Sequence, residues 1–318
     1  MTNLRKNDVK CYVKTEEKNK DPLDTLAQLR TKSCNCSDEN AVTLYKRAVS
    51  KYITNSIIFP LIDLDNIRKK RYWSTFHCVN ILLEDEGKII GKYCKQRWCV
   101  VCNRIRTAKL IKGYLPQVEK WQEPRFITLT YGKTVDSCDL KQRIKDMQSA
   151  WRKITDSNRK GNWGIKGVRK LEVTYSKGRY HAHYHVLVDG YDKSEKIISE
   201  WRKRTQETKP RSPKDNVKAD VNSVVELFKY FTKLFSKNSK GEIKTYPPKA
   251  MDNIFKVLTG KRTVQPFGGV KMIEEEFSDQ EANIHKETHV PIVWEWHDDF
   301  KSWVDFLTGE ILSKPGDQ

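Results

Sequence analysis

The sequence predicts an α+β fold built around an antiparallel sheet. Residues 168–189 contain two β-branched and aromatic stretches joined by a short turn with a glycine, which is typical of an antiparallel hairpin. Helical periodicity recurs in several other segments, without the repeating strand–helix–strand order of a parallel sheet. No internal repeat or long low-complexity tract is present.

Charge and composition narrow the class of protein. The 318 residues can form one large domain and one or two small ones, and 60 Lys and Arg against 41 Asp and Glu give a net charge of +19. This excess is typical of a protein that binds a polyanion, although a generic basic protein has it too. No apolar run reaches membrane-spanning length and the N-terminus does not resemble a signal peptide. We therefore expect a cytoplasmic protein without a membrane partner, whose 8 Cys serve metal binding rather than disulfides.

The N-terminal region, residues 1–72, is rich in Lys and poorly patterned. Its one amphipathic helix is predicted near 41–53, where Leu44, Ala48 and Tyr52 are in phase. We interpret the region as a mobile basic arm or a small accessory element, either partly disordered or in contact with DNA.

A cysteine cluster defines the next segment, residues 73–105. Cys99 and Cys102 form a C-x-x-C pair of the kind that holds zinc, and Cys94 and Cys78 can complete a structural four-thiolate site. The spacing of Cys78 is unusual, so His77 or the pair Cys34 and Cys36 stay open as the fourth ligand. A redox pair is the rival interpretation, weakened by the two further cysteines upstream and the lack of a βαβ context.

A larger domain is predicted over residues 106–275. It begins with a β-branched strand at 125–130, followed by a helix at 139–155 with Asp139 as its N-cap. Further helices are predicted near 194–205, 223–236 and 250–259. The apolar stripe of the first helix consists of Leu140, Ile144, Met147, Trp151 and Ile154.

The hairpin within this domain carries a candidate metal site. A turn centred on Lys177 and Gly178 pairs Glu172 with His183, Thr174 with His181 and Lys170 with His185. Alternation then places three histidines and a carboxylate on one face, and apolar side chains on the other. A row of solvated histidines is the alternative. The chain has only 7 His, however, and three fall within five positions at alternate spacing, which favours a divalent metal.

The helix predicted at 223–236 has a polar face opposite its apolar stripe. Steps of about 100° per residue place Glu226, Tyr230 and Lys233 together there. Two ordinary explanations stay open at this point. Ser223 and Glu226 have the spacing of a capping box, and Tyr230 can be a half-exposed tyrosine without a role.

Three motifs together resemble the single-tyrosine plasmid Rep proteins of the HUH endonuclease superfamily, which initiate rolling-circle replication. They are the strand FITLT, the hairpin LEVTYSKGRYHAHYHVLVDG and the sequence ELFKYFTK, which matches E-x-x-K-Y-x-x-K in full. The cysteine segment and the Gly260-Lys-Arg262…Phe267-Gly268 stretch also resemble this family, and the likeness covers about residues 76–275. Ala182 replaces a proline that is frequent in the family.

The resemblance implies a central antiparallel sheet with flanking helices, the hairpin in its middle and the Tyr230 helix across the metal face. It implies a DNA nicking-joining endonuclease in which Tyr230 attacks a phosphate, leaving a 5′-phosphotyrosine and a 3′-OH primer. His183, His185 and Glu172 would bind Mg²⁺ or Mn²⁺, and His181 would bind the metal, a phosphate or neither. Lys233, or else Lys229, would stabilise charge, Glu226 would activate the terminating water, and Lys229 and Arg262 would contact DNA.

The implied partners are origin DNA with a locally single-stranded site or hairpin, and a helicase and DNA polymerase of a bacterial host. A homo-oligomer stays open. So does the role of the C-terminal extension, residues 276–318, in which the segment with Trp294-Glu-Trp296 and Trp303 forms either a partner-binding helix or the last core element. Two alternatives remain: a relaxase or transposase of the same superfamily, and a non-catalytic zinc-dependent DNA-binding regulator. A tyrosine that follows the metal motif argues against a relaxase.

Overall fold

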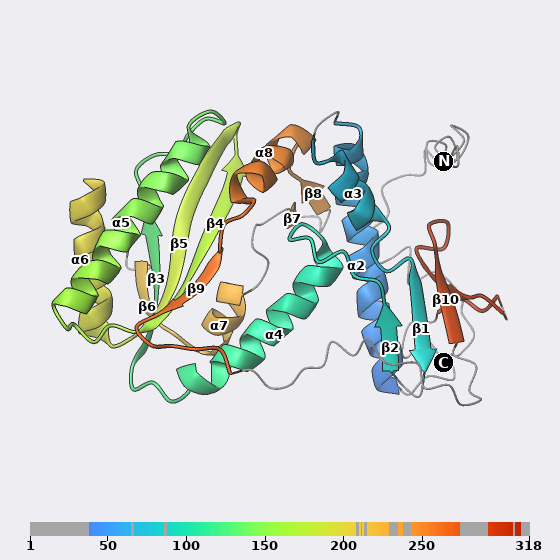
Figure 1. Cartoon of the computed structure of the whole chain (residues 1–318), viewed down its shortest axis with the longest axis horizontal. Coiled ribbons are helices and arrows are strands. Elements are labelled where there is room, and N and C mark those ends of the chain that lie inside the picture. The colour runs from blue at the N-terminus through green and yellow to red at the C-terminus, as the bar shows by residue number, and fades with distance from the viewer. Residues whose placement is uncertain are drawn as a thin grey trace.

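The computed structural model describes residues 38–64, 67–85, 88–207, 210, 212, 215–228, 235–237, 243–273, 292–307 and 309–312. In this part of the chain helices mix with strands, and every strand ladder is antiparallel, as the α+β prediction requires. Two sheets lie toward opposite ends of the molecule, and helices α2 and α4 lie between them (Figure 1). No helix among these residues is both long and apolar enough to cross a membrane.

The larger sheet has the strand order β6-β3-β5-β4-β9. Its strands are β3 (Pro124–Thr130), β4 (Gly167–Ser176), β5 (Arg179–Asp189), β6 (Asn216–Lys218) and β9 (Val264–Phe267). The hairpin β4–β5 occupies interior positions, as predicted, and its register matches the predicted pairs at His181, His183 and His185. Lys177 and Gly178 at the turn both have positive φ, 48° and 80°, which is typical of the type I′ turn that suits the strand twist.

The apolar face of this sheet packs against α5 (Leu140–Lys160) and α6 (Tyr191–Thr205). The predicted apolar stripe of α5 is confirmed, since all five of its residues are buried. Asp139 precedes α5, but its side chain makes no capping hydrogen bond, because its backbone is already helical, with φ −88° and ψ −15°. The predicted helix near 250–259 is α8 (Pro248–Leu258), whose apolar residues join the same core.

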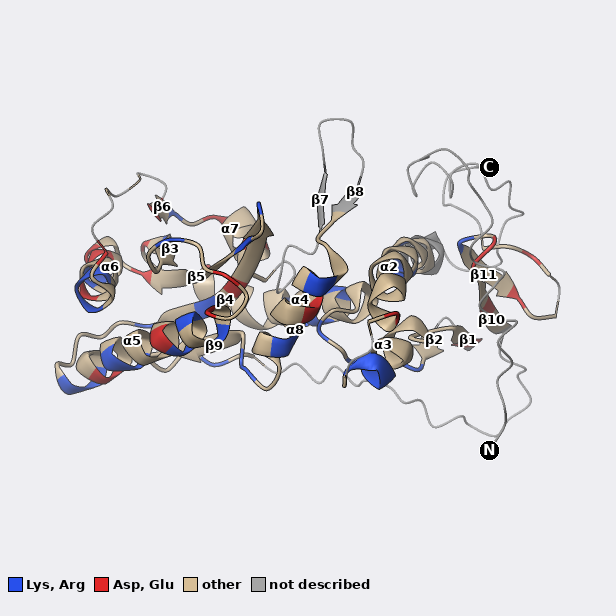
Figure 2. Ribbon diagram, turned by 90° about the horizontal axis from the view of Figure 1, so that it is seen from above, with Lys and Arg blue, Asp and Glu red and all other residues tan. Residues whose placement is uncertain are grey.

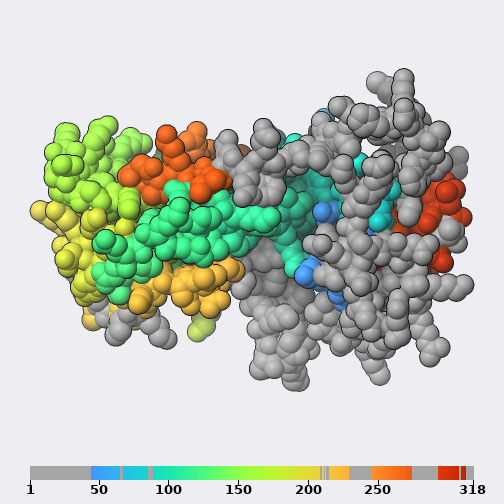
Figure 3. Space-filling view, turned by 90° about the horizontal axis from the view of Figure 1, so that it is seen from below, coloured from blue at the N-terminus to red at the C-terminus, as the bar shows by residue number. Residues whose placement is uncertain are grey.

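The opposite face of the sheet is partly covered by α4 (Val100–Val118) and α7 (Val221–Phe228). Val168 and Leu187, which alternate onto this face, pack with Leu227 and Phe228 of α7. Figure 3 shows α4 along the surface of the molecule, between α7 and the residues near 250–270. The predicted helix 223–236 is wrong at its end, because Phe235–Lys237 forms strand β7 and pairs with β8 (Ile243–Thr245). A run rich in Phe is compatible with both helical and strand periodicity, and pairing with β8 selects the strand.

The smaller sheet joins segments that are far apart in sequence. Its order is β11-β10-β1-β2, with β1 (Ile81–Asp85), β2 (Lys88–Gly91), β10 (Ile292–His297) and β11 (Ser302–Asp305). The C-terminal segment therefore contributes core strands, and its interpretation as a partner-binding helix is wrong. Trp294, Trp296 and Trp303 are buried against the cysteine cluster.

Helix α2 (Asp38–Ile62) extends beyond the helix predicted at 41–53. It contributes Leu44 and Ala48 to the core of the smaller sheet, and Ile57, Ile58 and Leu61 to the core of the larger one. The long helix thus links the two cores. Short helix α3 (Lys69–Phe76) follows it and packs against α2.

Candidate functional site

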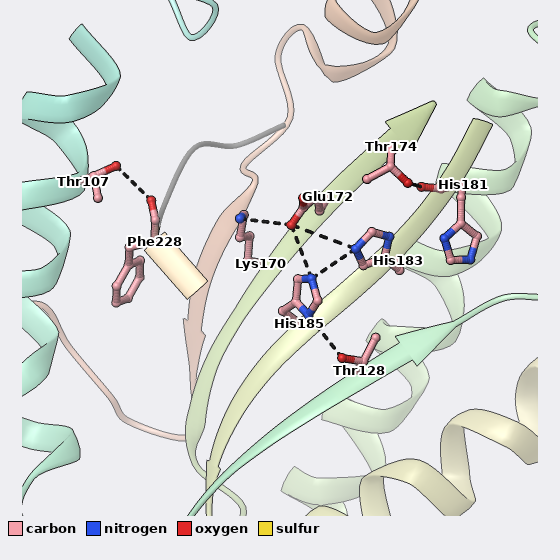
Figure 4. Close-up of polar contacts among 9 residues, drawn as sticks. All are labelled: Thr107, Thr128, Lys170, Glu172, Thr174, His181, His183, His185 and Phe228. Carbon is pink, nitrogen blue, oxygen red and sulfur yellow. Dashed lines mark hydrogen bonds and ion pairs between the residues drawn. The ribbon is translucent and has the colours of Figure 1, made fainter. Parts of the chain in front are cut away.

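Glu172, His183 and His185 form a compact cluster on the polar face of the β4–β5 hairpin (Figure 4). The two Nε2 atoms of His183 and His185 lie 3.1 Å apart. Glu172 Oε2 lies 3.3 Å from Nε2 of His185 and 3.9 Å from Nε2 of His183. Three ligand atoms therefore converge on one point, as the alternation of side chains predicted.

His181, the third histidine of the motif, lies outside this group. Its ring stacks on that of His183 with centroids 5.1 Å apart, and its backbone carbonyl accepts a hydrogen bond from Thr174. One strand step along β5 moves it away from the converging atoms, so the structure brings together three of the four predicted metal residues.

Two residues that the sequence analysis did not assign to the site support it. Lys170 is buried and its Nζ lies 3.1 Å from Glu172 Oε2. Thr128 of β3 places its Oγ1 3.2 Å from Nδ1 of His185, which directs Nε2 toward the cluster. The predicted hairpin register already set Lys170 opposite His185, so alternation could have identified it. Thr128 depends on the β3–β5 register, which sequence does not fix.

The protonation states suit a cation. Burial, together with the neighbouring charge of His185, lowers the pKa of His183 to about 3, so its imidazole is neutral and has a lone pair to donate. Burial alone would raise the pKa of Glu172. The hydrogen bond with His185 and the positive charge of Lys170 outweigh it and lower that pKa to about 2. The cluster thus offers a neutral nitrogen from His183 and a carboxylate from Glu172.

The geometry of the cluster also fits a metal. Ligand bonds of about 2.1 Å require ligand atoms to lie roughly 3.0–3.4 Å apart, the lower value for octahedral and the upper for tetrahedral coordination. Two of the three separations, 3.1 and 3.3 Å, fall in this range. Nδ1 of His183 is buried without a hydrogen-bond partner among the described residues. The group Glu172, His183 and His185 can therefore bind a metal and leaves coordination positions for another ligand.

Helix α7 begins differently from the prediction. Asp220 Oδ1 accepts a hydrogen bond from the Ser223 backbone N–H at 2.7 Å, and the Asp220 backbone N–H donates to Ser223 Oγ at 3.2 Å. This reciprocal pair is a capping box one turn earlier than the predicted pair of Ser223 and Glu226. Ser223 is already committed to Asp220, and Glu226 lies exposed in the second turn of α7.

The predicted tyrosine lies just beyond the described part of α7. Lys229, Tyr230 and Lys233 are outside the described residues, and Phe228 is the last residue described before them. Phe228 packs with Leu187, on the face of the sheet that carries the cluster, and its carbonyl accepts a hydrogen bond from Thr107 of α4 at 2.9 Å. Arg262 is exposed between α8 and β9.

A second cluster unites Cys78, Cys94, Cys99 and Cys102, the four predicted cysteines. Cys78 lies 3.6 Å from Cys102 and 3.7 Å from Cys99, and Cys94 lies 3.7 Å from Cys102, in each case between Sγ atoms. A tetrahedron with metal–sulfur bonds of about 2.3 Å has edges near ~3.8 Å, whereas a disulfide needs about 2.05 Å. The cluster can therefore bind a metal, and no disulfide joins its four cysteines.

The other candidates for the fourth ligand of the cysteine cluster were His77 and the pair Cys34 and Cys36. His77 bonds to Asn80 and stacks on Trp73, away from the four sulfurs. Cys34 and Cys36 lie outside the described residues. Lys51 of α2, which no sequence pattern singles out, is fully buried and donates a hydrogen bond to Asn80 Oδ1 at 2.7 Å. Burial lowers the pKa of Lys51 to about 8, an effect partly opposed by the charges of Cys78 and Cys99.

Comparisons with known proteins agree with the motifs. Residues 89–200 match a family model described as a replication protein. Over 115 residues the chain is 40% identical to "Protein rep" from Staphylococcus aureus, a match that covers 33% of this chain and 49% of that relative. The chain thus spans about half the length of the curated relative it matches. No solved structure matches the chain.

The predicted resemblance to rolling-circle plasmid replication initiators is thereby confirmed. The family match includes Glu172, His183 and His185 and three of the four clustered cysteines, and it ends before α7.

Proposed function

We propose that this chain, given its resemblance to replication proteins, initiates rolling-circle replication by nicking one strand of an origin through a tyrosine of an HUH-type nuclease domain. The observation that carries the proposal is the Glu172, His183 and His185 cluster on the middle hairpin of the larger sheet. Helix α7, which leads into the E-x-x-K-Y motif, packs on the same face of that sheet. Tyr230 follows Phe228 by two residues and is the proposed nucleophile.

The proposed reaction is a transesterification. The Tyr230 hydroxyl oxygen forms a bond to the scissile phosphorus, and the bond from phosphorus to the 3′ oxygen breaks. The phenol proton leaves and the 3′ oxygen is protonated, which yields a 5′-phosphotyrosine and a free 3′-OH. Because tyrosine has an ordinary pKa near ~10, the reaction needs nearby positive charge, for which Lys233 and Lys229 are the proposed sources.

The metals follow from the two ligand sets. Glu172, His183 and His185 would hold Mg²⁺ or Mn²⁺, which when bound polarises the phosphate and stabilises charge on its oxygens. His181, which lies outside the cluster, is better suited to a phosphate contact than to a ligand position. The four cysteines would hold a structural Zn²⁺.

The remaining roles concern DNA and the end of the cycle. Ser223 forms its capping hydrogen bonds with Asp220 and not with Glu226. We therefore keep Glu226 as the residue that would activate the terminating water. Arg262 would contact the DNA backbone, so affinity should depend on salt. The 3′-OH would prime a host polymerase, with a host helicase opening the duplex.

The test uses single strands tiled across the replicon that carries the gene, labelled at either end, with Mn²⁺ and the full chain. A strand labelled at its 3′ end should give a protein–DNA band that resists denaturation, and a strand labelled at its 5′ end should give only a shortened free product. Tyr230→Phe and metal chelation should each abolish the band. Tyr175→Phe, which alters a half-buried tyrosine of the hairpin's apolar face, is the matched control and should keep it.

Two outcomes would oppose the proposal. Salt-sensitive DNA binding without a covalent band on any strand would favour the non-catalytic regulator. A band that persists in Tyr230→Phe would move the nucleophile to another residue. Glu226→Ala should leave the first band intact and reduce only the hydrolytic second cleavage.

A further inference from the structure

A small cavity lies away from the hairpin cluster, where the cysteine segment meets the end of α8. It has a volume of about 180 Å³ and open access to solvent, and three pieces of chain line it. They are Arg71 of α3, residues 95–98 between Cys94 and Cys99, and the end of α8 through Gly260. No residue of the Glu172, His183 and His185 cluster or of α7 lines it.

The lining of this cavity is strongly basic. Arg71, Lys95 and Arg97 contribute three cations, and none of its residues is acidic. Arg97 directs its guanidinium to the backbone carbonyls of Leu258 and Lys261, which carry no full charge to offset it. Figure 2 shows the basic start of α3, Lys69 to Arg71, close to α8. Among the described residues no carboxylate forms an ion pair with these three cations.

The walls are held in place by packing and an ion pair. Trp98 packs on Phe255 with ring centroids 5.0 Å apart, and its Nε1 donates to Thr75 Oγ1 at 2.9 Å. Arg68, just before α3, forms an ion pair with Asp252 of α8, and Tyr72 donates its hydroxyl proton to the same carboxylate. A site built on fixed elements loses little entropy when a ligand binds.

Size and exposure decide between a base and a phosphate. Pockets for drug-sized ligands span about 300–1,000 Å³, so this cavity suits a smaller group. Trp98 and Phe255 are 5% and 4% exposed, which leaves no aromatic face on which a base could stack. Two arginines and a lysine suit an oxyanion instead.

We propose that this cavity binds one backbone phosphate of the origin DNA, at a position remote from the scissile phosphate. The inference deepens the proposed function and rests on it, since DNA is the phosphate polymer that such an initiator meets. Lys95 and Arg97 lie between Cys94 and Cys99, so a metal held by the four thiols would fix both ends of the segment that forms one wall of the cavity.

The test measures DNA binding against salt and requires no nicking. The probes are a fluorescein-labelled duplex of mixed sequence and its separate strand, without added Mg²⁺ or Mn²⁺. Arg71→Gln with Lys95→Gln should weaken binding and reduce the slope of log K against log salt by about 0.9 on duplex, or about 0.7 on the single strand, for one lost phosphate contact. The duplex and strand arms show which form occupies the cavity.

Two further variants separate the cavity from charge in general. Arg152→Gln with Lys153→Gln removes the same charges from exposed positions of α5 and should keep the slope of the unmodified chain. Thr259→Leu narrows the cavity without changing charge and should reduce the slope as the double variant does. Equal losses in the α5 and cavity variants, or an unchanged slope in Thr259→Leu, would overturn the proposal.

The failure of this inference is distinguishable from failure of the proposed function. Covalent capture of a short single strand that spans only the nick site depends on Tyr230 and should be retained in the cavity variants. Covalent capture of the strand, with no change in the salt slope of the cavity variants, would reject phosphate binding by the cavity and leave the nuclease proposal intact. A slope effect without any capture would support phosphate binding by the cavity and reject the nuclease.

Discussion

Lys170 Nζ lies 3.1 Å from Glu172 Oε2, and both side chains are buried at alternate positions of β4. The hydrogen bond with His185 and the ammonium of Lys170 together hold the carboxylate ionised in the interior of the protein. A metal bound by Glu172, His183 and His185 would contact the same Glu172 oxygen, Oε2, as Lys170 does. Lys170 and the metal would therefore both stabilise the negative charge of Glu172. Their energetic effects should therefore be coupled.

Lys170→Met should destabilise the metal-free chain by about 3–5 kcal/mol, because it leaves a buried carboxylate without its cation. Saturating Mn²⁺ should recover part of the loss, since the metal supplies a replacement charge. Urea unfolding with and without Mn²⁺ measures both. Lys166→Met breaks the more exposed pair with Asp189 and should cost less than ~1 kcal/mol. Equal losses at the two lysines would contradict a buried interaction.

His183→Ala and His181→Ala should differ sharply in metal affinity. His183 contributes a converging Nε2 atom, whereas His181 only stacks on the ring of His183. Outer residues of metal sites typically change affinity by about 10–100-fold, and a lost ligand should exceed that. Calorimetric titration with Mn²⁺ should find weak or no binding in His183→Ala and at most about a tenfold loss in His181→Ala. A loss in His181→Ala as large as that in His183→Ala would make His181 a ligand.

Removal of metal from the four cysteines should loosen the smaller sheet. Cys78, Cys99 and Cys102 pack in the same core as Trp294, Trp296 and Trp303, so the tryptophan emission should shift to longer wavelength when the metal leaves. Cys78→Ser should lower the zinc content found by mass spectrometry of the intact chain and reduce thermal stability. The matched variant Cys138→Ser changes an exposed thiol and should do neither.

The hairpin could be predicted from the sequence because its own residues determine it. A turn at Lys177 and Gly178 fixes the register, and alternation then places Glu172 opposite His183. The four cysteines were predictable by the C-x-x-C spacing, with Cys78 the least secure of them. In both cases the pattern lies within a short stretch of chain.

Other features depend on contacts that a local pattern does not contain. The pairing of β1 with β10 joins residues more than two hundred positions apart, and it turns the C-terminal tryptophans into core. Strand β7 replaces the end of the predicted helix at 223–236 because β8 pairs with it. Lys51 looks like an ordinary helix surface lysine until α2 is seen packed beside the cysteines.

Tyr72 should make stability sensitive to alkaline pH. Burial, together with the hydrogen bond to Asp252, raises the pKa of its hydroxyl above the ordinary value of 10.0. Above about pH 10 the unfolded chain loses this proton while the folded chain keeps it, so the unfolding free energy falls with pH. The raised pKa of Tyr72 changes the free energy of unfolding by at most ~1.4 kcal/mol per pH unit, and its stabilising effect is fully present below pH 10. Urea titrations should find a shallower alkaline decline in Tyr72→Phe, and parallel curves would reject the effect.

Lys51→Met should act in opposite directions on folding and on zinc binding. The buried ammonium is costly in the metal-free chain, so an apolar side chain of similar length should leave its stability unchanged or higher. Four thiolates around Zn²⁺ carry a net negative charge, and removing the neighbouring cation should weaken zinc affinity by about tenfold. Competition with a chromogenic chelator measures the affinity, and urea unfolding of the metal-free chain measures the stability. Lys46→Met on the same helix, an exposed lysine, is the control and should leave zinc affinity unchanged. Equal zinc affinity in Lys51→Met and the unmodified chain would show that Lys51 serves packing alone.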